Sequence, residues 1–176
     1  IEKLNTLNCS YTALPYPKNM NFLDINVLDK FIEDINIAGS IFSKANKVLC
    51  YHNHALEFQK INQEIILERI YNNTDNKYIQ GEPDVYWIQK GGHDPISWCK
   101  KLKNRLPLIH LKDFIMLNEH ESYYAEIGNG NLDIKNIIKE AALSGCKWYI
   151  VEQDECQGDP FISIETSFNN LLEFVT

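Results

Sequence analysis

Arginine is scarce in this sequence. Only two of the 176 residues, Arg69 and Arg105, are arginines, and the formal net charge is -7. Nucleic-acid-binding proteins carry a basic surface that neutralises phosphates, and no cluster of lysine and arginine stands out here. We therefore expect no nucleic-acid partner, and a small molecule or another protein instead.

Long apolar runs and paired cysteines are also missing. No apolar run approaches the roughly 18 residues that cross a bilayer, and the first segment, IEKLNTLNCS, lacks the basic-then-apolar pattern of a secretion signal. The five cysteines are an odd number and include no Cys-x-x-Cys pair, which favours reduced thiols. We expect a cytoplasmic protein that does not contact a membrane.

The length and composition are those of one globular unit. A chain of 176 residues, 44% of them hydrophobic, can bury one sizeable core, and no linker or repeat divides it. We expect residues 1–176 to form a single domain. Because the first residue is not methionine, we also expect the sequence to be part of a longer protein.

Apolar residues alternate between helical spacing and short uninterrupted runs. The runs predict strands near 9–17, 47–54, 77–87, 105–114 and 147–155, and the helical spacing predicts helices near 24–45, 62–73, 94–104, 132–145 and 162–175. Apolar strands that alternate with helices indicate a parallel sheet covered on both faces. No glycine-rich dinucleotide motif follows a strand, because EIGNG comes after a tract that resembles a loop.

Four residues mark the expected ends of these elements. Asn62 is a plausible N-cap for the second helix, and Asp94 with the following proline is a cap for the third. Gly145 predicts the end of the fourth helix. Pro83 predicts a strand end or a bulge, since proline is awkward inside a sheet.

Polar groups able to bind metal or move protons follow four of the predicted strands. They are His52-Asn53-His54, Asp84-Val85-Tyr86-Trp87, His110-Leu111-Lys112-Asp113 and Glu152-Gln153-Asp154-Glu155. Each has an ordinary structural explanation when taken alone, such as a capping aspartate or a surface ion pair. Alternating strands and helices fit both a doubly wound sheet and a barrel, but only in a barrel do all strand ends meet at one mouth. The four groups together favour the barrel.

These side chains suit a divalent metal ion (Mn, Mg, Co or Zn), because they mix oxygen and imidazole donors. Glu152 follows a strand of apolar residues, where an ionised carboxylate requires a cation or hydrogen-bond donors. Such an ion polarises a carbonyl and stabilises the enediolate that forms when a proton leaves the neighbouring carbon.

Five segments, in this order, then carry a family resemblance: YHNHALEF, PDVYWIQKGGHDPISW, LPLIHLKDF, EIGNGNLD and WYIVEQDE. Together they resemble the sugar phosphate isomerase/epimerase family of xylose-isomerase-like TIM barrels, over about residues 45–175. A complete barrel takes roughly 250 residues. The resemblance therefore implies an α/β fold of the parallel (β/α) TIM-barrel type, as a partial barrel of about five strand-helix units without the N-terminal part.

The resemblance also implies roles for individual residues. Asp84, His110 and Glu152 correspond to three metal ligands of the family. The fourth is usually a glutamate on the strand that here reads CYHNH, where His52 stands. Either His52 replaces it, or Glu57 reaches back, or the metal site is altered; we favour His52.

Catalysis in epimerases of this family uses two metal-bound glutamates, a pair that a histidine at the fourth ligand position would break. The candidate catalytic residues are therefore Glu152, His54, Glu57 and Lys112. His54 and Lys112 could hold substrate oxygens, and Trp87 could form an apolar wall for a sugar ring. The candidate substrate-binding residues are Asn53, Trp87, His54 and Lys112.

Four functions remain as hypotheses. The leading one is a divalent-metal-dependent isomerase or epimerase of a sugar or sugar phosphate, working through an enediolate. The alternatives are a lyase or dehydratase acting on a keto-inositol or 3-keto-sugar, an endonuclease-type relative, and a truncated barrel without catalysis. The acidic charge argues against the endonuclease. Because a sheet cut open exposes strand edges, a homo-oligomer is also expected.

Overall fold

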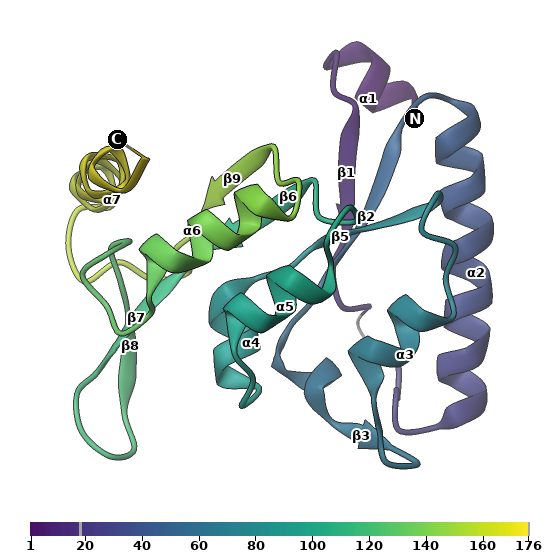
Figure 1. The fold of residues 1–176 in the computed structure, drawn as a ribbon, viewed down its shortest axis with the longest axis horizontal. Coiled ribbons are helices and arrows are strands. Elements are labelled where there is room, and N and C mark those ends of the chain that lie inside the picture. The colour runs from purple at the N-terminus through teal and green to yellow at the C-terminus, as the bar shows by residue number, and fades with distance from the viewer. Residues whose placement is uncertain (18, 176) are drawn as a thin grey trace.

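The central feature of the computed structural model, which describes residues 1–17 and 19–175, is a row of parallel strands (Figure 1). Its members are β1 (Tyr11–Leu14), β2 (Val48–His52), β5 (Ile79–Glu82), β6 (Leu108–Leu111) and β9 (Trp148–Val151). β2 pairs with both β1 and β5, and β6 pairs with β9. A parallel bridge between Asp84 and His110 joins the two groups beyond the end of β5.

Strand order in this row follows chain order throughout. A doubly wound sheet reverses its strand order at a switch point, whereas a barrel adds each strand beside the previous one. The order β1-β2-β5-β6-β9 is therefore that of a barrel, and the sequence prediction of a partial TIM barrel is confirmed.

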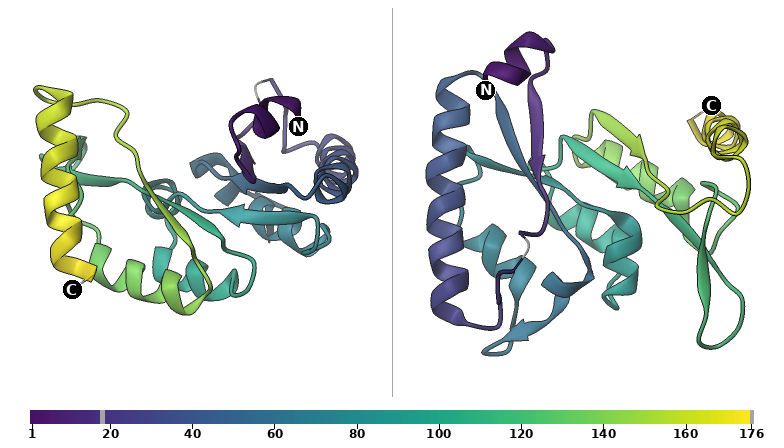
Figure 2. Two further views of the ribbon diagram at one scale, coloured as in Figure 1. Left: turned by 90° about the horizontal axis from the view of Figure 1, so that it is seen from above. Right: turned by 180° about the vertical axis from the view of Figure 1, so that it is seen from behind.

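Helices follow the strands and lie outside the row (Figure 2). They are α2 (Ile25–Lys44) after β1, α3 (Ile66–Asn72) after β2, α4 (Val85–Lys90) and α5 (Pro95–Lys101) after β5, α6 (Ile134–Leu143) after β6, and α7 (Pro160–Val175) after β9. A short α1 (Glu2–Thr6) precedes β1. None of the helices in the described residues is long and apolar enough to cross a membrane.

Helix α2 illustrates how the sequence builds this packing. Asp24 caps its first turn by accepting a hydrogen bond from Asn26 N. Its buried residues recur at helical spacing and join the hydrophobic core; they are Leu28, Phe31, Ile32, Ile35 and Gly39. Gly39 lies so close to Tyr78 O and Ile79 that a Cβ atom there would overlap them. The glycine thus allows α2 to pack directly on β5.

The predicted N-cap at Asn62 is wrong. Asn62 and Gln63 form the turn between two short antiparallel strands, β3 (Lys60–Ile61) and β4 (Glu64–Ile65), with φ values of 50° and 70°. Two positive φ values in a two-residue turn suit the primed hairpin turns, in which asparagine is favoured. Helix α3 consequently begins at Ile66.

Two further boundaries differ from the prediction. The strand expected over 77–87 ends at Glu82, and Asp84 caps α4 by accepting a hydrogen bond from Trp87 N. The tract before EIGNG, which we expected to resemble a loop, contains all of β8 (Ser122–Ala125), which forms an antiparallel hairpin with β7 (Asp113–Met116). The expected strand end at Pro83, the cap at Asp94 and the helix stop at Gly145 are confirmed.

Candidate metal centre

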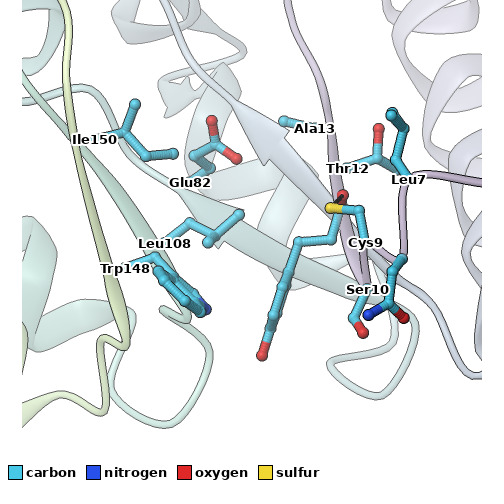
Figure 3. Close-up of a pocket in the computed structure, with 11 residues that line it drawn as sticks. Leu7, Cys9, Ser10, Thr12, Ala13, Glu82, Leu108, Trp148 and Ile150 are labelled. Atoms are coloured by element: carbon cyan, nitrogen blue, oxygen red, sulfur yellow. Dashed lines mark hydrogen bonds between the residues drawn. The ribbon is translucent and has the colours of Figure 1, made fainter. Parts of the chain in front are cut away.

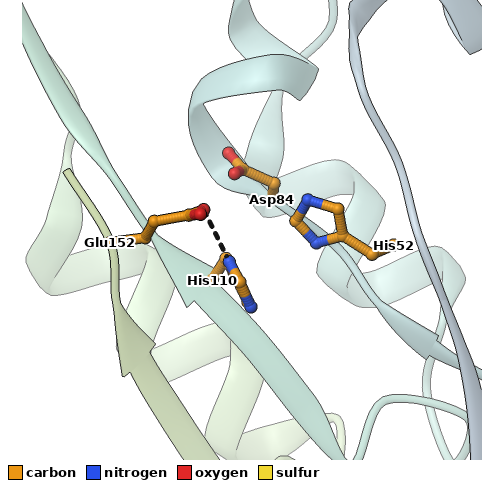
Figure 4. A group of neighbouring side chains, drawn as sticks. All are labelled: His52, Asp84, His110 and Glu152. Carbon is orange, nitrogen blue, oxygen red and sulfur yellow. Dashed lines mark hydrogen bonds and ion pairs between the residues drawn. The ribbon is translucent and has the colours of Figure 1, made fainter. Parts of the chain in front are cut away.

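Four side chains from four strand ends meet at the carboxyl edge of the row. His52 is the last residue of β2, His110 lies in β6, and Asp84 and Glu152 follow β5 and β9. One ligand atom from each lies within 4.8 Å of those of the other three (Figure 4). These are the four residues that the sequence analysis nominated as metal ligands, and the parallel register brings them together.

The cluster contains buried polar atoms that lack hydrogen bonds. His52 Nδ1 and Asp84 Oδ2 have no hydrogen-bond partner in the described part of the chain, and the two residues are 7% and 0% exposed. Leaving a buried atom such as His52 Nδ1 unsatisfied costs about 1 to 3 kcal/mol, whereas Asp84 Oδ2 has the ammonium of Lys112 at 3.4 Å. Two ligand atoms bound to a tetrahedral zinc ion lie about 3.4 Å apart, which is within the 4.8 Å that bounds this cluster. The donor set therefore fits a divalent cation.

Protonation of the two buried groups also suits metal binding. Burial, assisted by the neighbouring His110, lowers the pKa of His52 to about 3, so its imidazole is neutral. Burial raises the pKa of Asp84 to about 6, although Lys112 opposes this shift. A neutral imidazole and a carboxylate are the forms that bind metal ions.

His110 bridges two carboxylates. Its Nε2 lies 2.6 Å from Glu82 Oε1, and its Nδ1 lies 2.8 Å from Glu152 Oε2. Burial alone would lower the pKa of His110, but the hydrogen bonds to Glu152 and Glu82 outweigh it and raise the pKa to about 9. The same bond from His110 is the main cause that lowers the pKa of Glu152 to about 2.

Lys112 lies beside this cluster and is almost fully buried. Its Nζ is 3.4 Å from Asp84 Oδ2, 3.0 Å from Glu152 Oε2 and 3.1 Å from Asp154 Oδ1. Burial would lower the pKa of Lys112, but these carboxylates, Asp84 first, raise it. The ammonium also lies within 6.0 Å of three ring centroids, those of Tyr86, Trp87 and Tyr124.

Negative charge is in excess around these residues. Two cationic side chains, the ammonium of Lys112 and the imidazolium of His110, face four carboxylates, which are Glu82, Asp84, Glu152 and Asp154. A divalent cation at the cluster would offset part of this excess.

Glu57 lies apart from the four-residue cluster. Its carboxylate is fully buried and accepts hydrogen bonds from Tyr51 Oη at 3.0 Å and from His54 N at 3.1 Å. It thereby closes the 3₁₀ turn at Ala55–Phe58. Of the two residues considered for the fourth ligand position, the structure brings His52 and not Glu57 to the other three.

The remaining nominated residues surround the cluster. Asn53 is buried, and its Oδ1 accepts a hydrogen bond from Asp84 N at 3.3 Å. The ring of His54 lies 5.1 Å from that of His52 and 5.4 Å from that of Trp87. Burial and then Lys112 lower the pKa of His54, so its imidazole is neutral at pH 7.

Sequence reasoning missed the roles of Glu82 and Asp154. Glu82 contacts His110 from one side, and Asp154 pairs with Lys112 on the other. A signal was present in the alternation of strand side chains: Glu82 is two residues before Asp84, and Asp154 two residues after Glu152. Residues two apart on an extended chain project from the same face.

A cavity of about 570 Å³ opens between β1 and β9, the two outer strands of the row (Figure 3). Thr12 and Ala13 line it from β1, while Trp148 and Ile150 line it from β9. Glu82 also faces this cavity, so its carboxylate lies between the cavity and the metal-ligand candidates.

Comparison with known proteins places this arrangement in a family. No protein-family model matches the sequence. The chain is 26% identical over 145 residues to an inosose dehydratase from Clostridium tetani, covering 72% of this chain and 47% of that protein. It is 25% identical over 150 residues to an inosose dehydratase from Geobacillus thermodenitrificans, covering 76% and 50%. The chain thus spans about half the length of the curated relatives that it matches.

A solved structure gives a closer match. The chain superposes on a sugar phosphate isomerase/epimerase from Parabacteroides distasonis with a TM-score of 0.81 and 30% sequence identity. The match covers 97% of this chain and 60% of that one, as expected of a partial barrel. On its strand order, its motifs and this similarity, the chain belongs to the xylose isomerase-like TIM-barrel family of sugar phosphate isomerases and epimerases.

Proposed function

We propose that this chain carries the metal-binding part of an active site that moves a proton next to the carbonyl group of a sugar, as an isomerase or epimerase. The observation that carries the proposal is the convergence of His52, Asp84, His110 and Glu152 from four strand ends. Mixed oxygen and imidazole donors of this kind suit Mn, Mg, Co or Zn.

In this proposal the four residues hold the ion, which would polarise the substrate carbonyl and acidify the neighbouring C–H. The chain's other side chains position the reactants. Asn53 holds the backbone at Asp84, and Lys112 fixes the carboxylate of Glu152 through a 3.0 Å ion pair. Trp87 offers an aromatic face against which a sugar ring can pack.

Proton transfer falls to His54 in this scheme. The carboxylate of Glu152 is tied to His110 and Lys112, so it is a weak base as well as a proposed ligand. His54 makes no such ion pair in the described residues, and its ring lies 5.1 Å from that of His52 and 5.4 Å from that of Trp87. An imidazole in this place can take a proton from one carbon or oxygen and return it to another.

The substrate we propose is an unphosphorylated sugar. The ammonium of Lys112 is already matched by Asp84, Glu152 and Asp154. No other lysine or arginine takes part in the ion pairs of this cluster, as far as the described residues go. Phosphate recognition normally uses cationic side chains or free backbone N–H groups.

A dehydratase is the second candidate, because two relatives of this chain are named inosose dehydratases. Both reactions begin with loss of a proton beside a carbonyl. A dehydratase then expels a hydroxyl group from the next carbon, whereas an isomerase or epimerase returns the proton.

Isotope exchange separates these outcomes. The protein, purified without chelator and supplied with Mn²⁺, Co²⁺, Zn²⁺ or Mg²⁺, is incubated in D₂O with neutral ketoses and with a keto-inositol. Metal-dependent uptake of deuterium beside the carbonyl supports the proposal, and loss of water with formation of a conjugated product supports the dehydratase. Asp84→Asn should abolish either reaction. Absence of metal binding and of exchange with every substrate would contradict both.

A further inference from the structure

Glu82 is a nearly buried carboxylate for which the proposed reaction has no role. It ends β5, is 5% exposed, and has its strongest contact with His110. We propose that Glu82 is a positioning residue: it fixes His110 in the tautomer and orientation that present Nδ1 to a divalent cation. This inference rests on the proposed metal site.

The two side chains are in close contact. His110 Nε2 and Glu82 Oε1 form an ion pair at 2.6 Å, a distance at which Nε2–H has this carboxylate as its nearest acceptor. The two residues come from neighbouring strands, whose backbones join at the bridge between Asp84 and His110. Because both strands are held by the sheet, the imidazole cannot turn without breaking this bond.

The hydrogen bond decides which nitrogen of His110 carries the proton. A neutral imidazole has one N–H donor and one acceptor nitrogen. In the metal-free protein Nε2 lies against Glu82 and Nδ1 against Glu152, so a cation that binds Nδ1 must replace the proton there. Glu82 then holds the remaining proton at Nε2, and the lone pair of Nδ1 faces the other members of the cluster. A carboxylate behind a metal-bound histidine fixes the tautomer and increases the basicity of the ligand nitrogen.

Without Glu82, His110 would have a different preferred partner. Its Nδ1 already lies 2.8 Å from Glu152 Oε2, and without Glu82 the one proton of a neutral imidazole would stay on Nδ1, in a hydrogen bond to that carboxylate. That hydrogen bond would occupy both Nδ1 and Glu152 Oε2, so His110 and Glu152 would both be lost as ligands. When Glu82 holds the one proton of a neutral His110 at Nε2, Nδ1 and Glu152 Oε2 share no proton, and both are free to bind the cation.

Glu82 itself is a poor candidate for a further ligand. It is not one of the four residues whose ligand atoms lie within 4.8 Å of one another. It approaches His110 from the side of the cavity between β1 and β9, and its Oε1 is 4.0 Å from His52 Nδ1. Glu82 is therefore placed to hold His110 in position and not to bind the ion itself.

Binding measurements with matched variants test the role. Calorimetric titration with Zn²⁺ compares wild type, Glu82→Leu and Glu82→Gln. We expect Glu82→Leu to bind about 10-fold to 100-fold more weakly, the usual effect of losing such a support. Glu82→Gln removes the charge but keeps an oxygen that can accept from Nε2–H, and it should stay within about threefold of wild type. If Glu82→Gln binds as weakly as Glu82→Leu, charge and not positioning is responsible, and the proposal is overturned.

A spectroscopic reading separates positioning from general stability. In zinc-loaded wild type, the Nε2–H proton of His110 should exchange slowly with water in ¹⁵N spectra, and in Glu82→Leu at saturating zinc it should exchange rapidly. Asp113→Asn, a change at a buried carboxylate outside the cluster, should lower stability but leave zinc affinity unchanged. If wild type binds no metal, the proposed function fails as well; if wild type and Glu82→Leu bind equally, only the role of Glu82 fails. If Glu82→Leu does not fold, Glu82→Gln and the wild-type exchange rate still decide.

Discussion

Lys112 and Asp84 form an ion pair that is almost completely shielded from water. The Nζ–Oδ2 distance is 3.4 Å, and the two side chains are 2% and 0% exposed. The same ammonium contacts Glu152, another proposed metal ligand, at 3.0 Å. A divalent cation and the lysine would therefore share two carboxylates, and the positive charge of the lysine must weaken the binding of the cation.

Replacing Lys112 with methionine should make metal binding tighter. Removal of the ammonium ends the repulsion of a cation held by Asp84 and Glu152, and we expect the affinity for Zn²⁺ or Mn²⁺ to rise about tenfold or more. The metal-free variant should be less stable by about 3 to 5 kcal/mol, because a buried ion pair has lost one partner. Calorimetry and urea unfolding measure the two effects. Lys30→Met, at an exposed lysine of α2, should change neither; unchanged or weaker metal binding by Lys112→Met would refute this interpretation.

His52 and Glu57 can be distinguished as ligands by thermal unfolding. His52 contributes a ligand atom to the cluster, whereas the carboxylate of Glu57 is bound to Tyr51 and His54. The increase in Tm that wild type shows with added Mn²⁺ or Zn²⁺ should disappear in His52→Ala, with affinity at least about tenfold lower. Glu57→Gln should keep the increase. The opposite pattern would mean that Glu57 moves to the metal on binding.

Glu57 should make stability depend on pH. Burial, opposed by hydrogen bonds from His54 and Tyr51, raises its pKa to about 7 from an ordinary 4.5. The folded protein therefore holds this proton more tightly than the unfolded chain does. The stabilisation is complete below about pH 4.5 and is lost as pH rises through 7, a change of roughly 3 kcal/mol at most. Urea unfolding of wild type and Glu57→Gln across this interval measures it; a difference between them that stays constant with pH would disprove the assignment.

Asp113 should matter for stability and not for metal binding. Its carboxylate accepts hydrogen bonds from four backbone N–H groups at 2.8 to 3.2 Å, those of Phe114, Gly128, Gly130 and Leu132. Asp113→Asn loses an acceptor oxygen with two of these bonds, and should cost about 3 kcal/mol.

Gly130→Ala should also destabilise, because its Cβ would overlap the Asp113 carboxylate. Gly158→Ala, where a Cβ meets open space, is the control for urea unfolding. Equal stability of all three variants would rule out this role.

Several parts of the molecule were predictable from local pattern. Each strand is an apolar run, and His52, Asp84, His110 and Glu152 each lie at the end of one. Because parallel strands place these ends along one edge, the convergence of the four side chains follows from the strand order. The order itself could be inferred from the family resemblance and from the number of polar strand ends.

Other parts depend on contacts that the sequence does not encode locally. The bond between Glu82 and His110 requires the stagger between β5 and β6, which is visible only in the bridge at Asp84. Side chains of an extended chain point alternately to its two faces. Lys112 therefore faces the cluster, and its neighbour Asp113 faces the loop near Gly130. The turn at Asn62 could not be predicted from the local sequence either, because asparagine is favoured both at helix caps and in tight turns.

The open edges of the row lead to the last prediction, self-association of this chain. In the described residues β1 pairs only with β2 and β9 only with β6, and Trp148 at the outer strand is 59% exposed. Unpaired strand edges beside exposed apolar side chains favour association with another strand. Sedimentation velocity should show dimers or larger species at micromolar concentration.

Trp148→Lys should shift this equilibrium toward monomer by about tenfold, because a charge on the edge opposes strand pairing. Ile37→Lys introduces the same charge on the outer surface of α2, where the isoleucine is 53% exposed, and should leave the equilibrium unchanged. A wild-type chain that remains monomeric at all concentrations would show that the edges of β1 and β9 do not pair with a second copy. Equal effects of the two lysines would show instead that net charge, and not the edge, controls association.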